Sequence, residues 1–180
     1  MDAIQTERLT IRNFVPEDWE DLRTMVIQYQ ASPYAAYDHQ WPTSADELRG
    51  VAKWFASGDS YFAVCLRPMG TFIGFVCLNA EAGEPVHDLG YIFNSDHHGR
   101  GYATEACRAI VDHAFAVLGA ERVVTGTAAA NEPSCRLLER VGLKRVRESV
   151  GSLSEGADGK PIEFVGYDYA LSRDEWQQAR

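Results

Sequence analysis

Long apolar runs are absent from this sequence of 180 residues, and their absence argues against a membrane-spanning protein. A transmembrane helix requires about 20 consecutive apolar residues, and no stretch of the chain approaches that length. Residues 1–7 also have neither the basic nor the apolar region of a signal peptide. We therefore expect a cytoplasmic protein that has no membrane partner.

Positively charged residues are in the minority, since 17 lysines and arginines stand against 26 aspartates and glutamates, a net charge of −9 at pH 7. Nucleic-acid phosphates are bound by basic patches, so this balance argues against a nucleic-acid partner. An acidic chain is compatible with a cationic, amine-bearing substrate.

Cysteines are few and show no Cys-x-x-Cys spacing of the kind that binds zinc. The four of them lie within apolar segments, at Cys65, Cys77, Cys107 and Cys135. We expect reduced thiols in the protein core and no metal site. Neither an internal repeat nor a linker divides the chain, which we expect to form one domain over residues 1–180.

Alternating and helical patterns of apolar residues follow one another along the chain. Strands are predicted at residues 8–12, 61–66, 71–78, 86–94, 123–127, 143–152 and 162–170. Helices are expected to begin at Pro16, at Thr43 or Ser44, at Tyr102 and at Asn131. The last two strands would form a hairpin around a turn that contains Asp158 and Gly159. The order β-α-α-β-β-β-α-β-α-β-β predicts an α/β (α+β) fold, with a mixed, mostly antiparallel sheet flanked by about four helices.

A glycine-rich turn lies between the apolar strand over residues 89–93 and the helix that begins at Tyr102. Gly99 and Gly101 permit tight backbone turns and leave space for a ligand close to the main chain. The unpaired N–H groups at the start of the helix, together with the helix dipole, favour a bound anion, most often a phosphate. A nucleoside-triphosphate loop would need Gly-Lys-Ser/Thr, and a dinucleotide fingerprint would need a small residue where Thr104 stands.

Three motifs, in order along the chain, resemble the GNAT superfamily of acetyl-CoA-dependent N-acetyltransferases. The pattern Gly99-x-Gly101-x-Ala103 is similar to the pyrophosphate loop of that family. The opening Thr6-Glu7-Arg8-Leu9 and the segment Asn131-x-x-Ser134 resemble its ribosomal-protein N-terminal (RimJ/RimL-type) branch. The resemblance covers nearly the whole chain and implies a GNAT-like fold, acetyl-CoA as the acetyl donor and an amine as the acceptor.

The resemblance also implies which residues bind acetyl-CoA. Backbone N–H groups would hold the pyrophosphate at Gly99, Arg100, Gly101, Tyr102, Ala103 and Thr104. The preceding strand, splayed from its neighbour by a bulge, would bind the pantetheine arm and polarise the thioester near Ile92, Phe93 and Asn94. Asn131 would hydrogen-bond the cofactor near its thiol. Arg100 would add charge near phosphate, and in the alternative it is a solvated arginine with no specific role.

Catalysis requires one group that removes a proton from the amine and another that protonates the leaving thiolate. Many GNAT enzymes place a tyrosine acid seven residues after the asparagine, but that position here is Leu138. Ser134 is the substitute candidate for the acid, and its alternative role is a first-turn helix residue bonded to the backbone. Asp88 is the candidate base, acting through water, and its alternative role is a solvated carboxylate at a strand end.

Three further polar side chains near these motifs have competing interpretations. His97 and His98 would point in opposite directions on an extended segment, so we expect histidines that support the turn rather than metal ligands. Cys135 could carry the acetyl group in a ping-pong route, but its place in a helical repeat favours core packing.

The segment over residues 34–41 is rich in aromatic side chains. In the GNAT fold, the connection between the first two helices overhangs the acceptor site, so Tyr34, Tyr37 and Trp41 would bind the substrate. In the alternative, these side chains pack on the core.

The function expected from the motifs is transfer of the acetyl group of acetyl-CoA to a primary amine, by direct attack in a ternary complex. The acceptor would be a protein N-terminal α-amine, as in ribosomal proteins, and the alternative is a small polyamine or aminoglycoside-like compound. Two other possibilities are a non-catalytic acetyl-CoA sensor, because the tyrosine acid is missing, and a nucleotide site at the glycine loop. The chain would act as a monomer or a homodimer.

Overall fold

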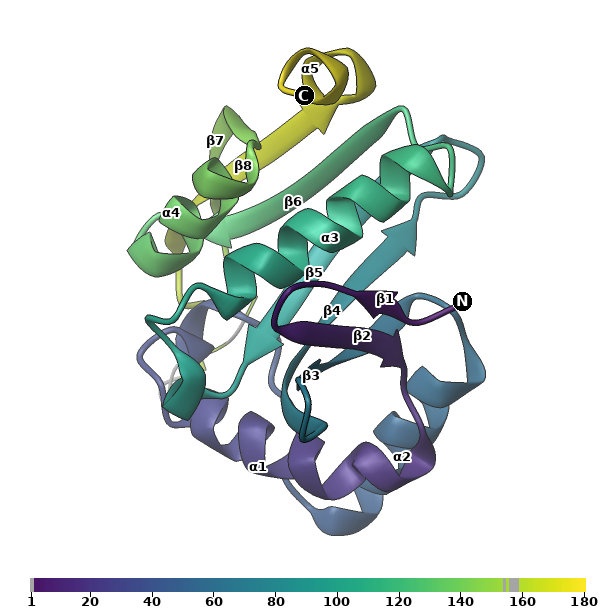
Figure 1. Ribbon diagram of the computed structural model, residues 1–180. Helices are drawn as coiled ribbons and strands as arrows, with labels where there is room; N and C mark the ends of the chain where they lie inside the picture. The colour runs from purple at the N-terminus through teal and green to yellow at the C-terminus, as the bar shows by residue number, and fades with distance from the viewer. Residues whose placement is uncertain (1, 154, 156–158) are drawn as a thin grey trace.

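The residues described by this computed structural model, 2–153, 155 and 159–180, form one mixed sheet of eight strands (Figure 1). The strands lie in the order β1-β2-β3-β4-β5-β6-β8-β7, and neighbours are antiparallel except for β5 and β6. Their bounds are β1 Ile4–Gln5, β2 Leu9–Asn13, β3 Tyr61–Leu66, β4 Thr71–Ala80, β5 Val86–Phe93, β6 Arg122–Ala128, β7 Lys144–Gly151 and β8 Phe164–Ser172. The predicted mixed, mostly antiparallel sheet is confirmed.

Five α-helices in the described chain surround the sheet: α1 Trp19–Gln30, α2 Ala45–Ser57, α3 Tyr102–Ala116, α4 Glu132–Val141 and α5 Arg173–Gln178. Three short 3-10 helices join them, η1 Pro16–Asp18, η2 Ala35–Tyr37 and η3 Ser95–His97. The sequence did not predict β1 or α5, because elements this short do not establish a period. Asp158, half of the predicted hairpin turn, lies outside the described residues.

Period-two alternation along the strands directs side chains into two separate cores. In β3, Phe62 and Val64 enter the core beneath α3, whereas Ala63 and Cys65 enter the core beneath α1 and α2. Helices α1 and α2 run together along one side of the sheet, and α3 crosses the other (Figure 1). Each fully buried large apolar side chain contributes about 1.5–3 kcal/mol, so these cores hold the strands firmly between the helices.

The sheet opens where β5 and β6 part. β5 pairs with β4 in regular register from His87 to Phe93, but it pairs with β6 only from Val86 to Asp88. β6 keeps its pairing with β8 as far as Ala128. The predicted separation of the strand from its neighbour is confirmed. The predicted bulge in this strand is wrong, because the described β4–β5 ladder has no register shift, and the gap begins where parallel pairing ends.

All four cysteines are free thiols, and three of them are buried. Burial raises the pKa of Cys77 to about 12, so its thiol stays protonated at neutral pH. None of the helices in the described part of the chain is both long and apolar enough to span a membrane.

Candidate active site

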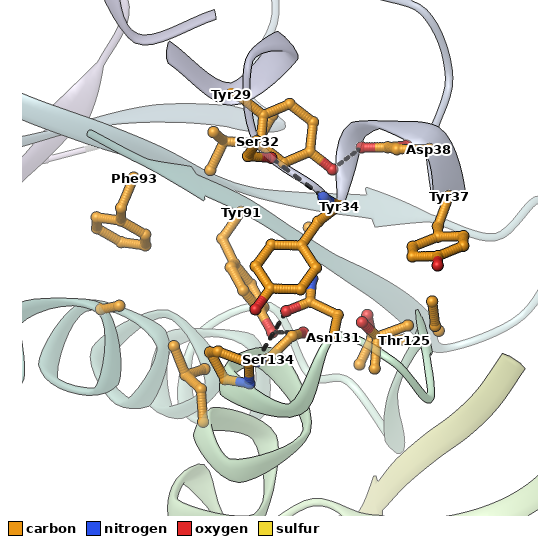
Figure 2. A pocket seen from close by; sticks show the side chains of 18 of the residues that line it. Tyr29, Ser32, Tyr34, Tyr37, Asp38, Tyr91, Phe93, Thr125, Asn131 and Ser134 are labelled. Atoms are coloured by element: carbon orange, nitrogen blue, oxygen red, sulfur yellow. Dashed lines mark hydrogen bonds between the residues drawn. The ribbon is translucent and has the colours of Figure 1, made fainter. Parts of the chain in front are cut away.

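The gap between the separated strands is part of a cavity of about 1030 Å³. Its walls come from β5 and β6, from the loop before α3, from the segment that connects α1 to α2, and from β7 and β8. Figure 2 shows tyrosines and polar side chains from several of these segments gathered around one space. Residues remote in sequence thus converge on a concave site of the kind that binds small ligands.

Residues 99–104, which we call the loop wall, run along one side of the cavity, and all of them except Arg100 line it. Gly99 and Gly101 have φ angles of 74° and 80°, in the left-handed region that strains any residue with a β-carbon. Gly101 is the N-cap of the 15-residue helix α3, and its carbonyl accepts the Glu105 N–H at 3.0 Å. The N–H groups of the three residues before Glu105 have no partner within the helix, so the loop wall carries positive potential.

A hydrogen-bonded pair of side chains, Tyr91 and Ser134, joins β5 to α4 (Figure 2). The Tyr91 and Ser134 hydroxyl oxygens are 2.7 Å apart, so the Ser134 hydroxyl bonds a side chain of β5 rather than the backbone of its own helix. Burial raises the pKa of Tyr91, and the phenol keeps its proton at neutral pH. Asn131 caps α4, and its Oδ1 accepts the Ser134 backbone N–H at 3.3 Å, which fixes Ser134 on the first turn.

Asp88 lies on the cavity wall at the point where β5 and β6 part. Although Asp88 keeps contact with solvent, desolvation by the surrounding chain raises its pKa, and the Glu81 carboxylate raises it further. Its ionised form is destabilised, which makes Asp88 a stronger proton acceptor than an ordinary aspartate.

Aromatic side chains form another wall, which we call the aromatic wall and define as Tyr34, Tyr37 and Phe164. The Tyr37 ring lies 5.5 Å from the Phe164 ring, so the α1–α2 connection contacts the start of β8. Also on the cavity wall, the Tyr29 hydroxyl donates to the Asp38 carboxylate at 2.8 Å. Burial, with Asp38 nearby, raises the pKa of Tyr29 and keeps it a donor.

Trp41 does not join the aromatic wall. Its ring centre lies 5.9 Å from that of Phe75 and 6.4 Å from that of Phe55, within the core beneath α1 and α2. The structure therefore brings Tyr34 and Tyr37 to the cavity, whereas Trp41 follows the alternative of core packing.

Charged side chains are unevenly distributed over the described walls. The basic one is Arg140, whose Nε lies 3.4 Å from Thr104 Oγ1 on the first turn of α3. The acidic ones are Asp38, Asp88 and Asp168, of which Asp168 is ion-paired with Arg147. The positively charged Arg140 thus adjoins the loop wall, and the three carboxylates lie on the other walls of the cavity.

Two residues predicted to bind the cofactor do not line the cavity. Asn94 makes hydrogen bonds away from the cavity: its N–H donates to the Ile73 carbonyl at 2.9 Å, and its Oδ1 accepts the Asp96 N–H at 2.9 Å. Arg100 is exposed, and its carbonyl accepts a hydrogen bond from Arg8 Nη1 at 2.9 Å. The other predicted cofactor residues lie on the walls, together with Ser134 and Asp88: Ile92, Phe93, Gly99, Gly101, Tyr102, Ala103, Thr104 and Asn131.

Among the cavity residues that the sequence did not predict are Tyr91, Arg140 and Phe164. Tyr91 could have been predicted from the sequence. It shares one face of an apolar strand with Leu89 and Phe93, and a hydroxyl buried on such a face needs a hydrogen-bond partner. Arg140 and Phe164 could not, since only the packing of α4 and β8 brings them to the cavity.

Two of the remaining polar candidates near the loop, His98 and Cys135, have structural contacts. His98 Nε2 lies 3.0 Å from the Phe93 carbonyl oxygen and so supports the turn. Cys135 is half-buried, with its Sγ 3.9 Å from the Ala128 carbonyl oxygen. Among the described residues, no group of three or more His, Cys, Asp and Glu side chains is arranged to hold a metal ion.

Comparisons with known proteins agree with this geometry. The family model described as Acetyltransferase (GNAT) domain matches residues 8–144. A protein of Bacillus subtilis (strain 168) named "Putative ribosomal N-acetyltransferase YdaF" is 30% identical over 183 residues, which cover 95% of this chain and 94% of that protein.

Solved structures with the same fold include an acetyltransferase (GNAT family) from Bacillus anthracis, with a TM-score of 0.81 and 24% identity. The likeness covers 96% of this chain and 99% of that chain. A spermidine N-acetyltransferase from Vibrio cholerae, in complex with CoA and spermine, has a TM-score of 0.79 and 17% identity over 96% of this chain and 99% of that chain.

Proposed function

This chain belongs to the acetyltransferase (GNAT) family and is an N-acetyltransferase, and we propose that its acceptor is the N-terminal α-amine of a protein. One observation carries the proposal: the unpaired edge of β5, the loop wall and the Tyr91–Ser134 pair all face one cavity. GNAT acetyltransferases use acetyl-CoA, so the cavity must accept a diphosphate, an extended arm that ends in a thioester, and an amine.

The described walls suit acetyl-CoA in three respects. The N–H groups of the loop wall, with Arg140 beside them, suit a diphosphate. The backbone of β5 beyond Asp88, which β6 no longer pairs, offers N–H and C=O groups to the amides of the pantetheine arm, near Ile92 and Phe93. A volume of about 1030 Å³ is at the upper end of ligand pockets, which leaves room for an acceptor beside the donor.

Acetyl-CoA supplies an acetyl group activated as a thioester. Backbone N–H groups near Ile92 and Phe93 would donate to the carbonyl oxygen and stabilise the charge that develops there as the C–N bond forms. Asn131 would hold the thiol end in place. Ser134 would give its hydroxyl proton to the sulfur as the C–S bond breaks, and would recover, through water, the proton that the amine loses.

Tyr91 supports this role for Ser134. The protonated phenol can donate its single hydrogen to Ser134 Oγ, which leaves the Ser134 hydrogen free to point into the cavity. The reverse arrangement would leave a buried phenolic hydrogen to find another acceptor. The Tyr91–Ser134 pair would thus provide an oriented proton donor in a chain that has Leu138 in place of the tyrosine acid of many GNAT enzymes.

Asp88 would accept the proton that the amine loses, through water. A protein α-amine has a pKa of about 8, so roughly one molecule in ten is neutral at pH 7. A lysine-like alkylamine has a pKa of about 10.4, so roughly one in 2,500 is neutral at pH 7. An α-amine therefore depends less on a general base than an alkylamine does. This suits a cavity in which the candidate base is a single carboxylate, Asp88.

The aromatic wall would receive the first side chain of the acceptor, between Tyr34, Tyr37 and Phe164. The ribosomal name of the relative YdaF supports a protein acceptor. A cytoplasmic location, where ribosomal proteins are made, suits a chain whose four thiols are free.

A small polyamine is the second candidate acceptor. The Asp38 and Asp88 carboxylates would attract the additional cationic groups of such a molecule. The fold is also that of a spermidine N-acetyltransferase.

A panel of acceptors tests the proposal by the release of CoA thiol from acetyl-CoA. Peptides that begin with Ala, Ser or Met, each containing one internal lysine, would be compared with the same peptides blocked at the N-terminus and with spermidine. We expect release with free N-termini and none with blocked ones. Release with spermidine alone would replace the protein acceptor by a polyamine, and calorimetric acetyl-CoA binding without any release would indicate a sensor.

A further inference from the structure

Arg8 connects the turn between β1 and β2 to the loop wall, and acetyl transfer as derived above does not use it. Its Nε donates to Glu105 Oε2 at 2.7 Å, and its Nη2 lies 2.6 Å from the same oxygen. Its Nη1 donates to the Arg100 carbonyl oxygen at 2.9 Å. The guanidinium also lies 4.7 Å from the centre of the Tyr102 ring. One side chain therefore contacts the loop, the first residue of α3 and the first turn of that helix.

Glu105 is held on both carboxylate oxygens. Oε1 accepts the Thr6 hydroxyl at 2.6 Å and the Arg8 backbone N–H at 3.0 Å. Burial would raise the pKa of Glu105, but the hydrogen bonds from Thr6 and Arg8 outweigh it and lower the pKa below its ordinary value. The Glu105 side chain is 17% exposed and that of Arg8 is 43% exposed, so solvent partly screens this ion pair, and its hydrogen bonds hold the geometry.

The turn that carries Arg8 is itself held in place. Its two ends are joined by the Thr6 N–H, which donates to the Leu9 carbonyl at 2.9 Å. From the end of β3, the Arg67 N–H donates to the Arg8 carbonyl at 2.9 Å, and Arg67 Nη1 donates to the Thr6 carbonyl at 2.8 Å. Arg8 therefore extends from a fixed part of the sheet.

The hydrogen bond from Arg8 to the Arg100 carbonyl has a consequence for the next residue. In a trans peptide the carbonyl and the following N–H point in opposite directions, so the Gly101 N–H points away from Arg8. Gly101 lines the cavity whereas Arg8 lies outside it, which is the arrangement expected if this N–H faces the cavity. Without this hydrogen bond, the glycines at 99 and 101 would permit the Arg100–Gly101 peptide to rotate, because glycine has few backbone restrictions.

We propose that Arg8, held by Glu105, which Thr6 bonds in turn, is a positioning residue that keeps the Arg100–Gly101 peptide turned with its N–H toward the cofactor diphosphate. The proposal rests on the proposed function for the identity of that ligand and is independent of the acceptor. It also gives a role to the opening motif Thr6-Glu7-Arg8-Leu9, whose side chains lie outside the cavity wall.

Truncation of the ligand tests the proposal without any acceptor. CoA carries the diphosphate, whereas pantetheine carries the thiol arm alone, and calorimetry measures the Kd of each. For Arg8→Met we expect the Kd of CoA to rise about tenfold, equivalent to about 1.4 kcal/mol, with the Kd of pantetheine unchanged. Arg8→Lys keeps the charge but loses the planar fork, so we expect a similar loss. Glu105→Gln should raise the Kd of CoA about threefold, because Arg8 loses its anchor.

Arg49 provides a matched control. It pairs with Asp46 at 2.8 Å and lies 4.0 Å from the Trp19 ring centre, on α2 and away from the cavity walls. Arg49→Met thus removes the same charge, one ion pair and one ring contact, and we expect the Kd of CoA to stay within twofold of the wild-type value. Thermal melting of each variant identifies loss of folding, and Glu105→Gln carries the test if Arg8→Met does not fold.

Three outcomes would overturn the positioning role: equal losses for CoA and pantetheine in Arg8→Met, no loss for CoA, or full CoA affinity in Arg8→Lys. The last would mean that charge near the diphosphate suffices. A different result, a wild-type protein that binds CoA no better than pantetheine, would count against the diphosphate site and hence against the proposed function itself.

Discussion

The loop wall and the aromatic wall of the cavity are built by different means. The loop wall is a continuous segment, residues 99–104, and it offers main-chain N–H groups at the start of α3. The aromatic wall takes Tyr34 and Tyr37 from one segment and Phe164 from another far along the chain, and it offers side chains. Apart from a change to proline, a substitution leaves the main-chain N–H in place, whereas it can replace a ring. The loop wall therefore suits a ligand that does not vary, acetyl-CoA, whereas the aromatic wall permits a change of acceptor on the same fold.

The largest effect is expected between the two walls, at Ser134. Without its hydroxyl the thiolate must leave unprotonated, so Ser134→Ala should lower kcat about 100-fold while the KM for both substrates stays within twofold. Tyr91→Phe should lower kcat about tenfold and cause no further loss when combined with Ser134→Ala. Steady-state kinetics with the best acceptor of the panel measures both. Ser57→Ala, a hydroxyl bonded to the Trp54 carbonyl on α2, is the control, and an active Ser134→Ala variant would refute the role.

The second effect concerns the loop wall alone. Gly101→Ala places a β-carbon at a φ of 80° and about 3.4 Å from Arg8, so the N–H groups shift and the KM for acetyl-CoA should rise about 30-fold. The KM for the acceptor should not change. Gly83→Ala is the matched control, because Gly83 has a φ of 81° in an open turn outside the cavity walls. An equal effect of Gly83→Ala on the acetyl-CoA KM would mean that strain alone, not the loop wall, is responsible.

The third effect is a pH dependence at Asp88. Its raised pKa means that the base is ionised only at higher pH, so wild-type kcat/KM should fall as pH decreases through that pKa. Asp88→Asn should lower kcat/KM about tenfold at pH 7 and remove this fall. A raised folded-state pKa stabilises the folded protein below the unfolded pKa, and that stabilisation is lost as pH rises. Asp88→Asn should therefore raise the thermal melting temperature at pH 7, and an unchanged pH profile would exclude Asp88 as the base.

The smallest effect concerns the aromatic wall. Phe164→Ala removes the ring that contacts Tyr37, so the KM for a peptide acceptor should rise about threefold while the KM for acetyl-CoA stays constant. Val165→Ala is the control, because Val165 is adjacent, 40% exposed and outside the cavity walls. If Phe164→Ala instead raised the KM for acetyl-CoA, the two walls would not be separate.

The predictable parts of the fold and site share one property, which is short range. The turn at Gly99 and Gly101 and the helix that follows are local, because positive φ angles and an unpaired helix start depend on residues within one turn. The Asn131 cap, which bonds the Ser134 N–H, is local in the same sense. The Tyr91–Ser134 pair is not local, because 43 residues separate its members. Trp41 is aromatic like Tyr37, but it packs in the core whereas Tyr37 lines the cavity.

The sequence by itself determined the family, the order of the longer elements and the position of the loop wall, because each rests on contiguous residues whose backbone preferences are intrinsic. Only the tertiary structure decided that pairing between β5 and β6 stops at Asp88, that Tyr91 bonds Ser134, and that Arg8 holds the loop from outside. These contacts join segments whose distance in space depends on how two cores pack against one sheet. No local pattern encodes that distance.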